Sequence, residues 1–256
     1  MALKDEIARV TVRSMADVRA AAAAIRDIAW ERARLRTAIA DNIASKVPMM
    51  DEDGAILADE VHGWNAPHER WWADTRLALS SPLPRACRYE SEPFWVNAEG
   101  FRTHQRNRYL EAMDLANFEK RAMCKAAIVI PIHLPFGQIG AASFTSSDPE
   151  HTDLSREFED HADELALLAH RFVAGYVKAN RTRHWLPMDC QLTKREVECL
   201  RWASIGKTDK EISLILGRSH ATVRFHIQNA GEKLDAVNRS QTIFKASQLG
   251  YLGSAA

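Results

Sequence analysis

Three predicted helix starts follow one another between residues 193 and 219, and this series constrains the fold more than any other part of the chain. Each of the first two starts has a threonine with a glutamate three residues later, the spacing of a capping box. A glycine follows each resulting helix, where a left-handed residue commonly closes the last turn. The cap residues are Thr193, Thr208 and Ser219, the glutamates are Glu196 and Glu211, and the glycines are Gly206 and Gly217. The segment therefore predicts three short helices joined by tight turns.

Apolar residues recur at three- and four-residue steps behind each cap, as expected for the buried face of an amphipathic helix. Two short helices joined by a glycine-containing turn are typical of a helix-turn-helix, whose second helix lies in the major groove of DNA. We expect the inward positions to be Val197, Leu200, Ala203, Ile212, Ile215, Leu216, Val223, Ile227, Ala230 and Leu234. The exposed face of the last helix offers His220, Thr222, Arg224, Phe225, Gln228 and Asn229.

The tripeptide Gly206-Lys207-Thr208 also occurs in phosphate-binding loops of nucleotide-binding proteins. Such a loop needs another glycine five residues before the Gly-Lys pair, because the backbone must wrap its N–H groups around a phosphate. Arg201 occupies that position, inside the first predicted helix. We therefore interpret the tripeptide as part of the helix-turn-helix and expect no ATP-binding loop.

Residues 192–252 resemble the DNA-binding domain of LuxR-type transcription regulators, an all-α unit of four helices. The matching positions are Glu196, Leu200, Gly206, Lys207, Thr208, Glu211, Ile212, Thr222, Val223, His226, Lys233, Leu234, Asn238 and Arg239. The resemblance implies double-stranded DNA as a partner. The expected DNA-binding residues are Lys207, Thr208, Lys210, Arg218, Ser219, His220, Thr222, Val223, Arg224, His226, Gln228, Asn229, Lys233 and Arg239.

These residues divide by their chemistry. Cationic side chains suit phosphates and give an affinity that falls with salt, whereas base edges are recognised by side chains that form specific hydrogen bonds. We expect Arg224, Gln228 and His220 to contact bases, and Val223 and Ile227 to be core. The predicted phosphate contacts are Lys207, Lys210, Arg218, Lys233 and Arg239.

The charge distribution agrees with this division. The whole chain carries 34 Lys and Arg residues and 34 Asp and Glu residues, but from residue 181 onward the counts are 12 and 7. The tail is therefore basic, which suits a polyanionic partner. Four cysteines without CxxC spacing and the absence of a signal peptide or long apolar run predict a soluble, cytoplasmic protein with reduced thiols and no membrane partner.

The first 180 residues mix helix and strand patterns, which predicts an α+β domain. Residues 3–46 contain no Gly or Pro and have a helical stripe, so we expect one long amphipathic helix, and 100–123 also have helical spacing. Residues 126–134 and 139–146 predict a β-hairpin, and 153–179 another helix. Further expectations are a helix near 68–79, an extended segment at 87–96, a linker at 181–190, and domains at 1–180 and 191–256.

The hairpin at 128–146 resembles the autoinducer-binding domain of quorum-sensing LuxR-type regulators, which implies an α-β-α sandwich that binds acyl-homoserine lactones. Several positions depart from the family pattern: Ser81 stands for an Asp that accepts from the ligand's amide, His68 for a Trp, with Trp64 as the alternative, and Ala127 for a Gly. We therefore expect altered pocket chemistry, with either an acyl-homoserine lactone or another small molecule as the signal. The predicted ligand-binding residues are Trp72, Ser81, Tyr89, Trp95 and Ser143.

Two alternatives remain for this first domain. It is either a small-molecule sensor or a ligand-free module that dimerises or binds a protein partner, and in both cases we expect a homodimer. The candidate dimer contacts are the first helix and the helix at 153–179. No HExxH, GxSxG or nucleotide-binding glycine pattern occurs and the histidines lack metal-ligand spacing, so no enzyme activity, metal or cofactor is expected.

Overall fold

The computed structural model describes residues 2–66, 80–148, 150–180 and 190–253. These residues form two compact units, a mixed α/β unit before residue 181 and a helical unit after it. In the described part of the chain, no helix is long and apolar enough to cross a membrane. Within the same ranges, no two cysteines form a disulfide bond.

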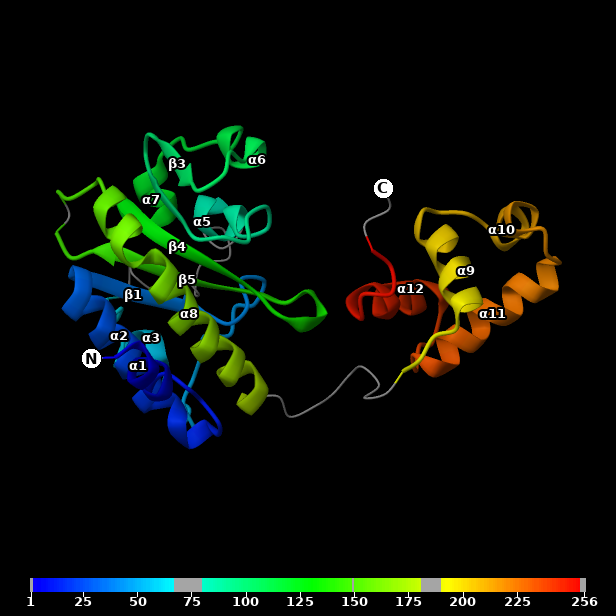
Figure 1. The fold of residues 1–256 in the computed structure, drawn as a ribbon, viewed down its shortest axis with the longest axis horizontal. Coiled ribbons are helices and arrows are strands. Elements are labelled where there is room, and N and C mark those ends of the chain that lie inside the picture. The colour runs from blue at the N-terminus through cyan, green and yellow to red at the C-terminus, as the bar shows by residue number, and fades with distance from the viewer. Residues whose placement is uncertain (1, 67–79, 149, 181–189, 254–256) are drawn as a thin grey trace. The chain divides into compact units, whose positions relative to one another are not determined.

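A five-stranded antiparallel sheet organises the first unit, with strand order β1-β5-β4-β2-β3 (Figure 1). The strands are β1 (Leu35–Ala40), β2 (Phe94–Asn97), β3 (Gly100–Thr103), β4 (Ala126–His133) and β5 (Ile139–Ser146). The predicted hairpin is confirmed: β4 and β5 pair with Ile128 opposite Phe144 and are joined by the turn η4 (Pro135–Gly137). Because side chains alternate along a strand, each strand contributes to two separate apolar layers.

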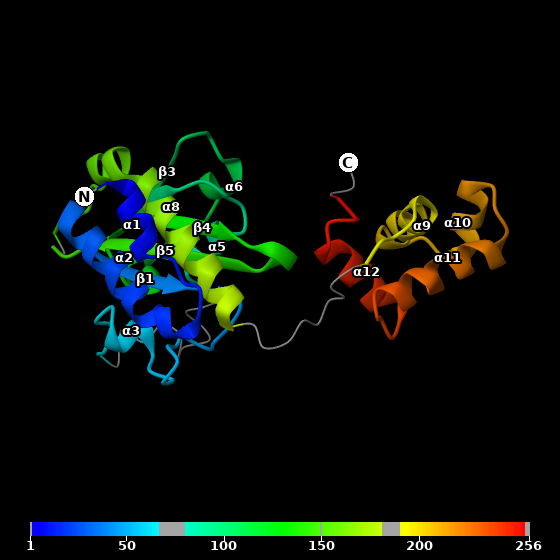
Figure 2. The same ribbon diagram turned by 60° about the horizontal axis from the view of Figure 1, so that its bottom comes forward.

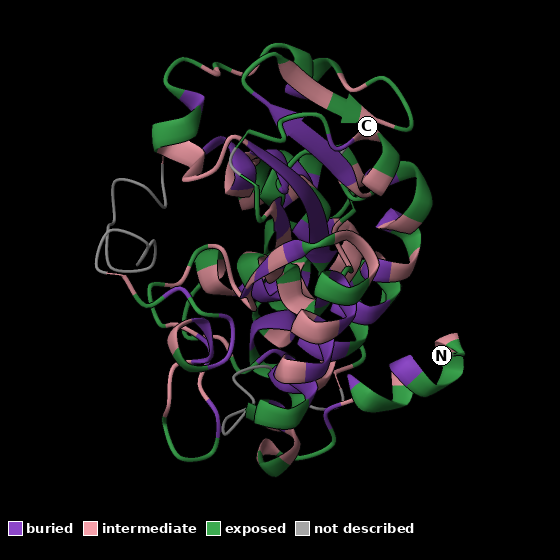
Figure 3. Cartoon of the chain, turned by 90° about the vertical axis from the view of Figure 1, so that its left-hand side faces the viewer, coloured by how far each residue is buried: buried purple, intermediate pink, exposed green. Residues whose placement is uncertain are grey.

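Three helices and a short 3-10 turn pack on one face of this sheet (Figure 2). They are α1 (Leu3–Arg9), η1 (Met15–Asp17), α2 (Val18–Ala33) and α8 (Ser155–Asn180). Their stripe of Ile25, Ile28, Leu165, Leu168 and Phe172, each at most 1% exposed, meets the inward side chains of the central strands. Figure 3 shows these buried residues concentrated along the strands and on the sides of the helices that face them.

Short helices lie on the other face: α5 (Pro82–Ala86), α6 (Arg108–Glu111) and α7 (Phe118–Ala122), while α3 (Leu57–Glu60) follows β1 in the chain. The core between α5–α7 and the sheet includes Cys87, Phe94, Val96, Ala127 and Val129. The first unit is therefore an α-β-α sandwich, as the sequence predicts.

The single long helix expected over 3–46 is wrong. The chain forms α1, η1 and α2 and then enters β1, although no Gly or Pro interrupts it. Ser14 and Asp17 form a capping box that starts a new helical segment, and Arg34 adopts a left-handed conformation (φ 53°) that ends α2. Ile39, expected on the helical stripe, lies in β1 with its side chain in the core. Caps and a left-handed residue thus end a helix where composition alone predicts continuation.

Two further expectations are revised. The segment 100–123 is not one helix but β3 followed by α6 and α7, and α7 lies between Asn117 and Met123, which are both left-handed. Within 87–96, only the residues of β2 are extended as a strand, because Cys87 and the residues next to it continue from α5. The helix expected at 68–79 and the linker at 181–190 lie mainly outside the described residues.

The second unit consists of α9 (Lys194–Ser204), α10 (Asp209–Leu216), α11 (His220–Lys233) and α12 (Arg239–Gln248). Both predicted capping boxes are present, with Thr193 N–H donating to Glu196 at 2.7 Å and Thr208 N–H to Glu211 at 2.8 Å. Gly217 closes α10 with φ 60°, and Ser219 accepts from Thr222 N–H to start α11. The local signals are thus confirmed.

The core of this unit follows the predicted stripes except at Val197, which is only half-buried, and at Ile215. Leu200, Ile212, Val223, Ala230 and Leu234 are at most 1% exposed. The expectation that Ile215 faces inward is wrong, because this residue is 43% exposed. Leu216, four residues after Ile212, packs against the same core and takes the inward place at the end of α10.

Candidate functional site

The exposed side of α11 carries most of the predicted base-contacting groups. His220, Arg224 and Gln228 are exposed and lie near one another along the helix, while Val223 and Ile227 point into the core. Phe225, at 57% exposed, packs its ring edge against His226 with ring centroids 5.9 Å apart. The surface is therefore polar and cationic but includes one large apolar side chain.

The remaining predicted DNA-binding residues differ in how far their side chains are exposed to solvent. The exposed ones are Thr208, Lys210, Arg218, Ser219 and Lys233, the half-buried ones are Lys207, Thr222, His226, Asn229 and Arg239, and Val223 is buried at 1% exposure. Lys210 and Arg218 have no hydrogen-bond or ion-pair partner among the described residues. These two side chains are consequently the best placed of the predicted phosphate contacts.

Lys233 and Arg239, by contrast, hold the unit together. Lys233 donates to both carboxylate oxygens of Glu196 at 2.9 Å, and this carboxylate is only 4% exposed. Burial raises the pKa of Glu196, but the hydrogen bonds from Lys233 and Thr193 outweigh it, so the pKa is lowered overall. Arg239 forms an ion pair with Asp209 and donates to the Lys207 carbonyl at 2.8 Å. Both cations fasten α11 and α12 to the preceding helices, and a phosphate would have to compete for them.

Lys245 supports the end of α11, although no sequence motif marks it. Its side chain is buried (4% exposed) and donates to the carbonyls of Leu234 at 3.0 Å and Asp235 at 2.6 Å. These carbonyls lie at the C-terminal end of α11, where a cation is favoured by the helix dipole. Lys245 therefore fixes the end of the recognition helix from α12. Nothing in its sequence surroundings distinguishes it from a surface lysine.

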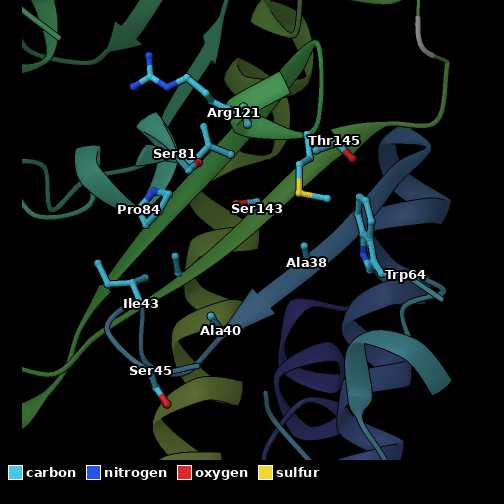
Figure 4. Close-up of a pocket in the computed structure, with 14 residues that line it drawn as sticks. Ala38, Ala40, Ile43, Ser45, Trp64, Ser81, Pro84, Arg121, Ser143 and Thr145 are labelled. Carbon is cyan, nitrogen blue, oxygen red and sulfur yellow. The ribbon is translucent and has the colours of Figure 1, made fainter. Parts of the chain in front are cut away.

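The first unit holds an apolar cavity of about 120 Å³ on the face of β1 and β5 that is turned away from α8 (Figure 4). Side chains at alternate strand positions provide its floor, as the pleat requires. An engineered apolar cavity of about 150 Å³ is known to take up benzene, so this one suits a small apolar group. The lining residues are Ala38, Ala40, Ile43, Ser45, Trp64, Ser81, Leu83, Pro84, Arg121, Ala122, Met123, Ala141, Ser143 and Thr145.

Hydroxyl groups supply the polar chemistry of this cavity, and one of them, that of Ser45, already accepts from the Val47 N–H at 3.0 Å. Ser81, Ser143 and Thr145 line it, and their side chains have no hydrogen-bond partner among the described residues. Ser81 and Thr145 are only 9% and 7% exposed, so a ligand that fills the cavity would meet them away from bulk water. A hydroxyl can both donate and accept, whereas a carboxylate only accepts. The cavity is thus equipped for uncharged groups such as carbonyls and hydroxyls.

Trp64 forms one wall of the cavity and is fixed on both sides. Its indole N–H donates to the Thr37 carbonyl at 2.6 Å, and the Arg36 guanidinium lies 3.9 Å from the ring centroid. Because the indole has only this one donor, its N–H is already used and the ring offers the cavity an apolar surface. This residue is the alternative Trp considered from the sequence, and it lines the cavity.

Arg121 lines the cavity without giving it a free charge. Its guanidinium donates to the Ser80 carbonyl at 2.7 and 2.9 Å, to the Ala116 carbonyl at 3.0 Å and to the Asp114 carboxylate at 2.8 Å. The guanidinium points away from the cavity in Figure 4. Arg121 therefore ties the segment before α5 to the loop before α7. No charged group of the described lining is directed at a ligand.

Two of the predicted ligand-binding residues lie elsewhere. Tyr89 is 52% exposed and stacks on Tyr109 at the surface, with centroids 5.3 Å apart. Trp95 is in the core on the α8 side of the sheet, beneath the Arg102 guanidinium at 5.6 Å. Phe94, one residue earlier, points to the opposite face, so strand alternation places Trp95 away from the cavity. Both assignments are corrected.

The other residues predicted to shape the pocket differ in where they lie relative to the cavity. Ser81 and Ser143 line the cavity together, although 62 positions separate them in the chain. Ala127 is fully buried in the core beside α5 and is not among the lining residues, so its methyl group does not narrow the cavity. Trp72 and His68 lie outside the described residues. Among the residues that are described, no group of three metal-ligating side chains could hold a metal ion.

An α-β-α sandwich with an apolar cavity, joined in one chain to a helix-turn-helix unit, defines a two-unit protein with separate candidate sites for a small molecule and for DNA. Two family models match these units: "Autoinducer binding domain" over residues 60–174 and "Bacterial regulatory proteins, luxR family" over residues 190–246. The transcriptional activator protein LuxR of Aliivibrio fischeri is 39% identical over 202 residues, which cover 79% of this chain and 76% of that protein. The chain belongs to the LuxR family.

Other matches are shorter. The activator VanR of Vibrio anguillarum is 42% identical over 132 residues, or 50% of this chain and 52% of that protein. LuxR of Aliivibrio fischeri strain ES114 is 43% identical over 121 residues, which cover 47% of this chain and 47% of that protein. The chain thus spans about half the length of these two curated relatives. A crystal structure of Escherichia coli SdiA covers 72% of both chains at 26% identity, with a TM-score of 0.39.

Proposed function

We propose that the protein is a sequence-specific DNA-binding transcription regulator that acts in the cytoplasm as a homodimer. In this proposal residues 191–256 bind DNA, residues 1–180 bind a small signal molecule and dimerise, and 181–190 join them. The relatives named transcriptional activators support the assignment. A dimer follows from the small surface of one helix-turn-helix, since two half-sites are needed for tight specific binding.

The observation that carries the proposal is the exposed side of α11. His220, Arg224 and Gln228 project from a helix whose opposite side is held in the core by Val223 and Ile227. The ion pair between Lys233 and Glu196 and the hydrogen bonds that the buried Lys245 donates to backbone carbonyls fix the C-terminal part of this helix. A rigid helix with polar side chains on its free side is what base recognition in the major groove requires.

The signal molecule is an uncharged, mainly apolar compound whose polar groups pair with hydroxyls. Ser81, Ser143 and Thr145 supply those hydroxyls, and no charge of the described lining faces the cavity. An acyl-homoserine lactone would find no carboxylate at Ser81 to accept its amide N–H, and a hydroxyl forms a weaker bond than a carboxylate does. We therefore favour a signal that offers carbonyl or hydroxyl groups and no amide.

Selection from a random-sequence duplex library tests the DNA-binding function. The full-length protein, supplied with small-molecule extracts, is expected to enrich a motif with two-fold symmetric half-sites. A pool that stays random both alone and with small-molecule extracts would contradict the proposal. The same experiment separates the two roles of the first unit: enrichment without any ligand favours the alternative, a ligand-independent regulator whose first unit only dimerises or binds a protein, whereas enrichment that requires an extract favours a sensor.

A further inference from the structure

A hollow of about 210 Å³ lies in the helical unit between the N-terminal halves of α9 and α11. Its floor is apolar, with Cys199 and Val223 at 2% and 1% exposure, and its rim is polar and cationic. A water molecule occupies about 30 Å³ of the liquid, so the hollow has room for a group with several oxygen atoms. The residues that line it are Arg195, Cys199, Leu216, Arg218, Thr222, Val223 and His226.

Two guanidinium groups converge on this rim. Arg218 is exposed and has no hydrogen-bond or ion-pair partner among the described residues. The Arg195 side chain, 53% exposed, donates to the Glu198 carboxylate at 2.7 Å. This hydrogen bond is the main cause of the lowered pKa of Glu198, and the charge of Arg218 contributes in the same direction. Arg195 and Arg218 thus both line the hollow and lie close enough to act on one anionic group, as they do on the Glu198 carboxylate.

We infer that this hollow binds a phosphate group of the DNA backbone, and that Arg195 of α9 is one of its two cationic ligands. The inference rests on the proposed DNA-binding function. A guanidinium matches a phosphate with two parallel hydrogen bonds, and phosphate contacts of this kind set the position of a protein on DNA. Thr222 and His226 line the hollow from α11 and can donate to the same phosphate.

The position of the hollow identifies DNA as the source of the phosphate. Thr222 and His226 flank Arg224 at two residues on either side, so they belong to the helix that would enter the major groove. A strand bordering that groove would pass the side of α11 that faces α9. Arg195 then contacts the backbone from outside the helix-turn-helix, and the phosphate is held between two helices.

Glu198 acts as an internal competitor for Arg195. This surface pair contributes little to folding, because solvent screens the attraction between its charges. A phosphate can therefore displace Glu198 from Arg195, but breaking this ion pair lowers the net affinity for DNA. Removal of the carboxylate should strengthen DNA binding, and this gain should depend on Arg195.

The test uses the full-length protein and a labelled duplex of arbitrary sequence, titrated at NaCl concentrations from about 50 to about 200 mM. Arg195→Ala should weaken binding about tenfold and reduce the slope of log affinity against log salt by about 1. Lys194→Ala is the matched control, because this exposed neighbour carries the same charge and does not line the hollow. It should leave the salt slope unchanged. Unchanged thermal unfolding of both variants shows that they are folded.

A second pair of variants tests the competitor. Glu198→Gln should strengthen binding about threefold, and the gain should disappear when Arg195→Ala is also present. Equal salt slopes for Arg195→Ala and Lys194→Ala, or a Glu198→Gln gain that persists without Arg195, would overturn the inference while leaving DNA binding intact. If inorganic phosphate alone stabilises the protein through Arg195 and duplex affinity does not change, the site binds a free anion and its assignment to DNA is overturned. Failure of the wild type to bind any duplex would overturn the proposed function itself.

Discussion

The two units of this protein differ in the range of the interactions that form their sites. In the helical unit, α9, α10 and α11 each begin at a cap, a glycine follows α9 and α10, and the predicted base contacts lie on the single helix α11. In the sandwich, the cavity joins Ala38, Trp64, Ser81 and Ser143 from segments that are distant in the sequence. The comparison shows that one chain can combine a site encoded by local signals with a site that depends on strand pairing.

The largest expected difference between the two units is in their stability at acidic pH, which we expect to fall in the sandwich because of a buried histidine. His62 is 6% exposed, and neither ring nitrogen has a hydrogen-bond partner among the described residues. Burial is the main cause that lowers the pKa of His62 to about 4. The backbone of Ala22 acts in the opposite direction and raises this pKa, whereas the charge of Arg26 lowers it further. Because this pKa is below the unfolded value of about 6.5, the neutral ring favours the folded state at neutral pH, and that stability is lost as the pH falls from about 6.5 through 4.

The loss attributable to His62 should reach about 3 kcal/mol between pH 7 and pH 4. In His62→Leu, the unfolding free energy of the sandwich should depend less steeply on pH over this range than in the wild type. Denaturant unfolding at several pH values measures the difference. His170→Leu, at an exposed position of α8, is the control and should follow the wild type. Parallel pH profiles for wild type and His62→Leu would show that the buried ring does not titrate in this range.

A smaller contrast compares one helical glycine from each unit. A Cβ atom on Gly175 in α8 would lie 2.7 Å from the Val12 carbonyl oxygen, whereas one on Gly231 in α11 would lie 3.1 Å from the Thr242 hydroxyl. The backbone of residue 12 belongs to a distant segment and cannot move easily, but a hydroxyl can shift by a few tenths of an ångström. Alanine also gains about 1 kcal/mol of helix propensity over glycine in both cases.

Gly175→Ala should therefore destabilise the sandwich by about 1 to 3 kcal/mol, and Gly231→Ala should change the stability of the helical unit by less than about 1 kcal/mol. Thermal unfolding of the two full-length variants gives the comparison. A greater loss for Gly231→Ala would mean that packing across the helical unit is tighter than its local signals suggest.

The same difference in range explains what the sequence could predict. Thr193 with Glu196, Thr208 with Glu211 and the turn at Gly217 are all spaced within one helical turn, so the helices of the second unit could be found without knowing their neighbours. Which face of a strand lines a cavity depends on pairing with other strands. For this reason Ser143 lies at the cavity, whereas Trp95, also predicted to bind the ligand, lies on the opposite face of the sheet.

Side-chain partners show the same limit within the helical unit. Lys233 and Lys245 carry the same charge as Lys210, but the first two are engaged by Glu196 and by the end of α11, and this is visible only in the folded unit. Arg195 is not among the DNA-binding residues predicted from the sequence, because it precedes the helix-turn-helix. Its proximity to Arg218 arises from the packing of α9 against α11. Motif spacing identifies helices, whereas the use of each charge depends on tertiary contacts.

The most direct test of the central claim compares Arg224→Ala with Lys210→Ala on the duplex enriched from the random library and on a scrambled duplex. Arg224→Ala should lose affinity for the enriched duplex by about 1 to 3 kcal/mol while binding the scrambled one almost as well as the wild type, because its contact is to a base. Lys210→Ala should weaken both complexes equally, because its contact is to phosphate. If Arg224→Ala retains the wild-type preference for the enriched duplex, α11 does not recognise the sequence through this residue, and the central claim is contradicted.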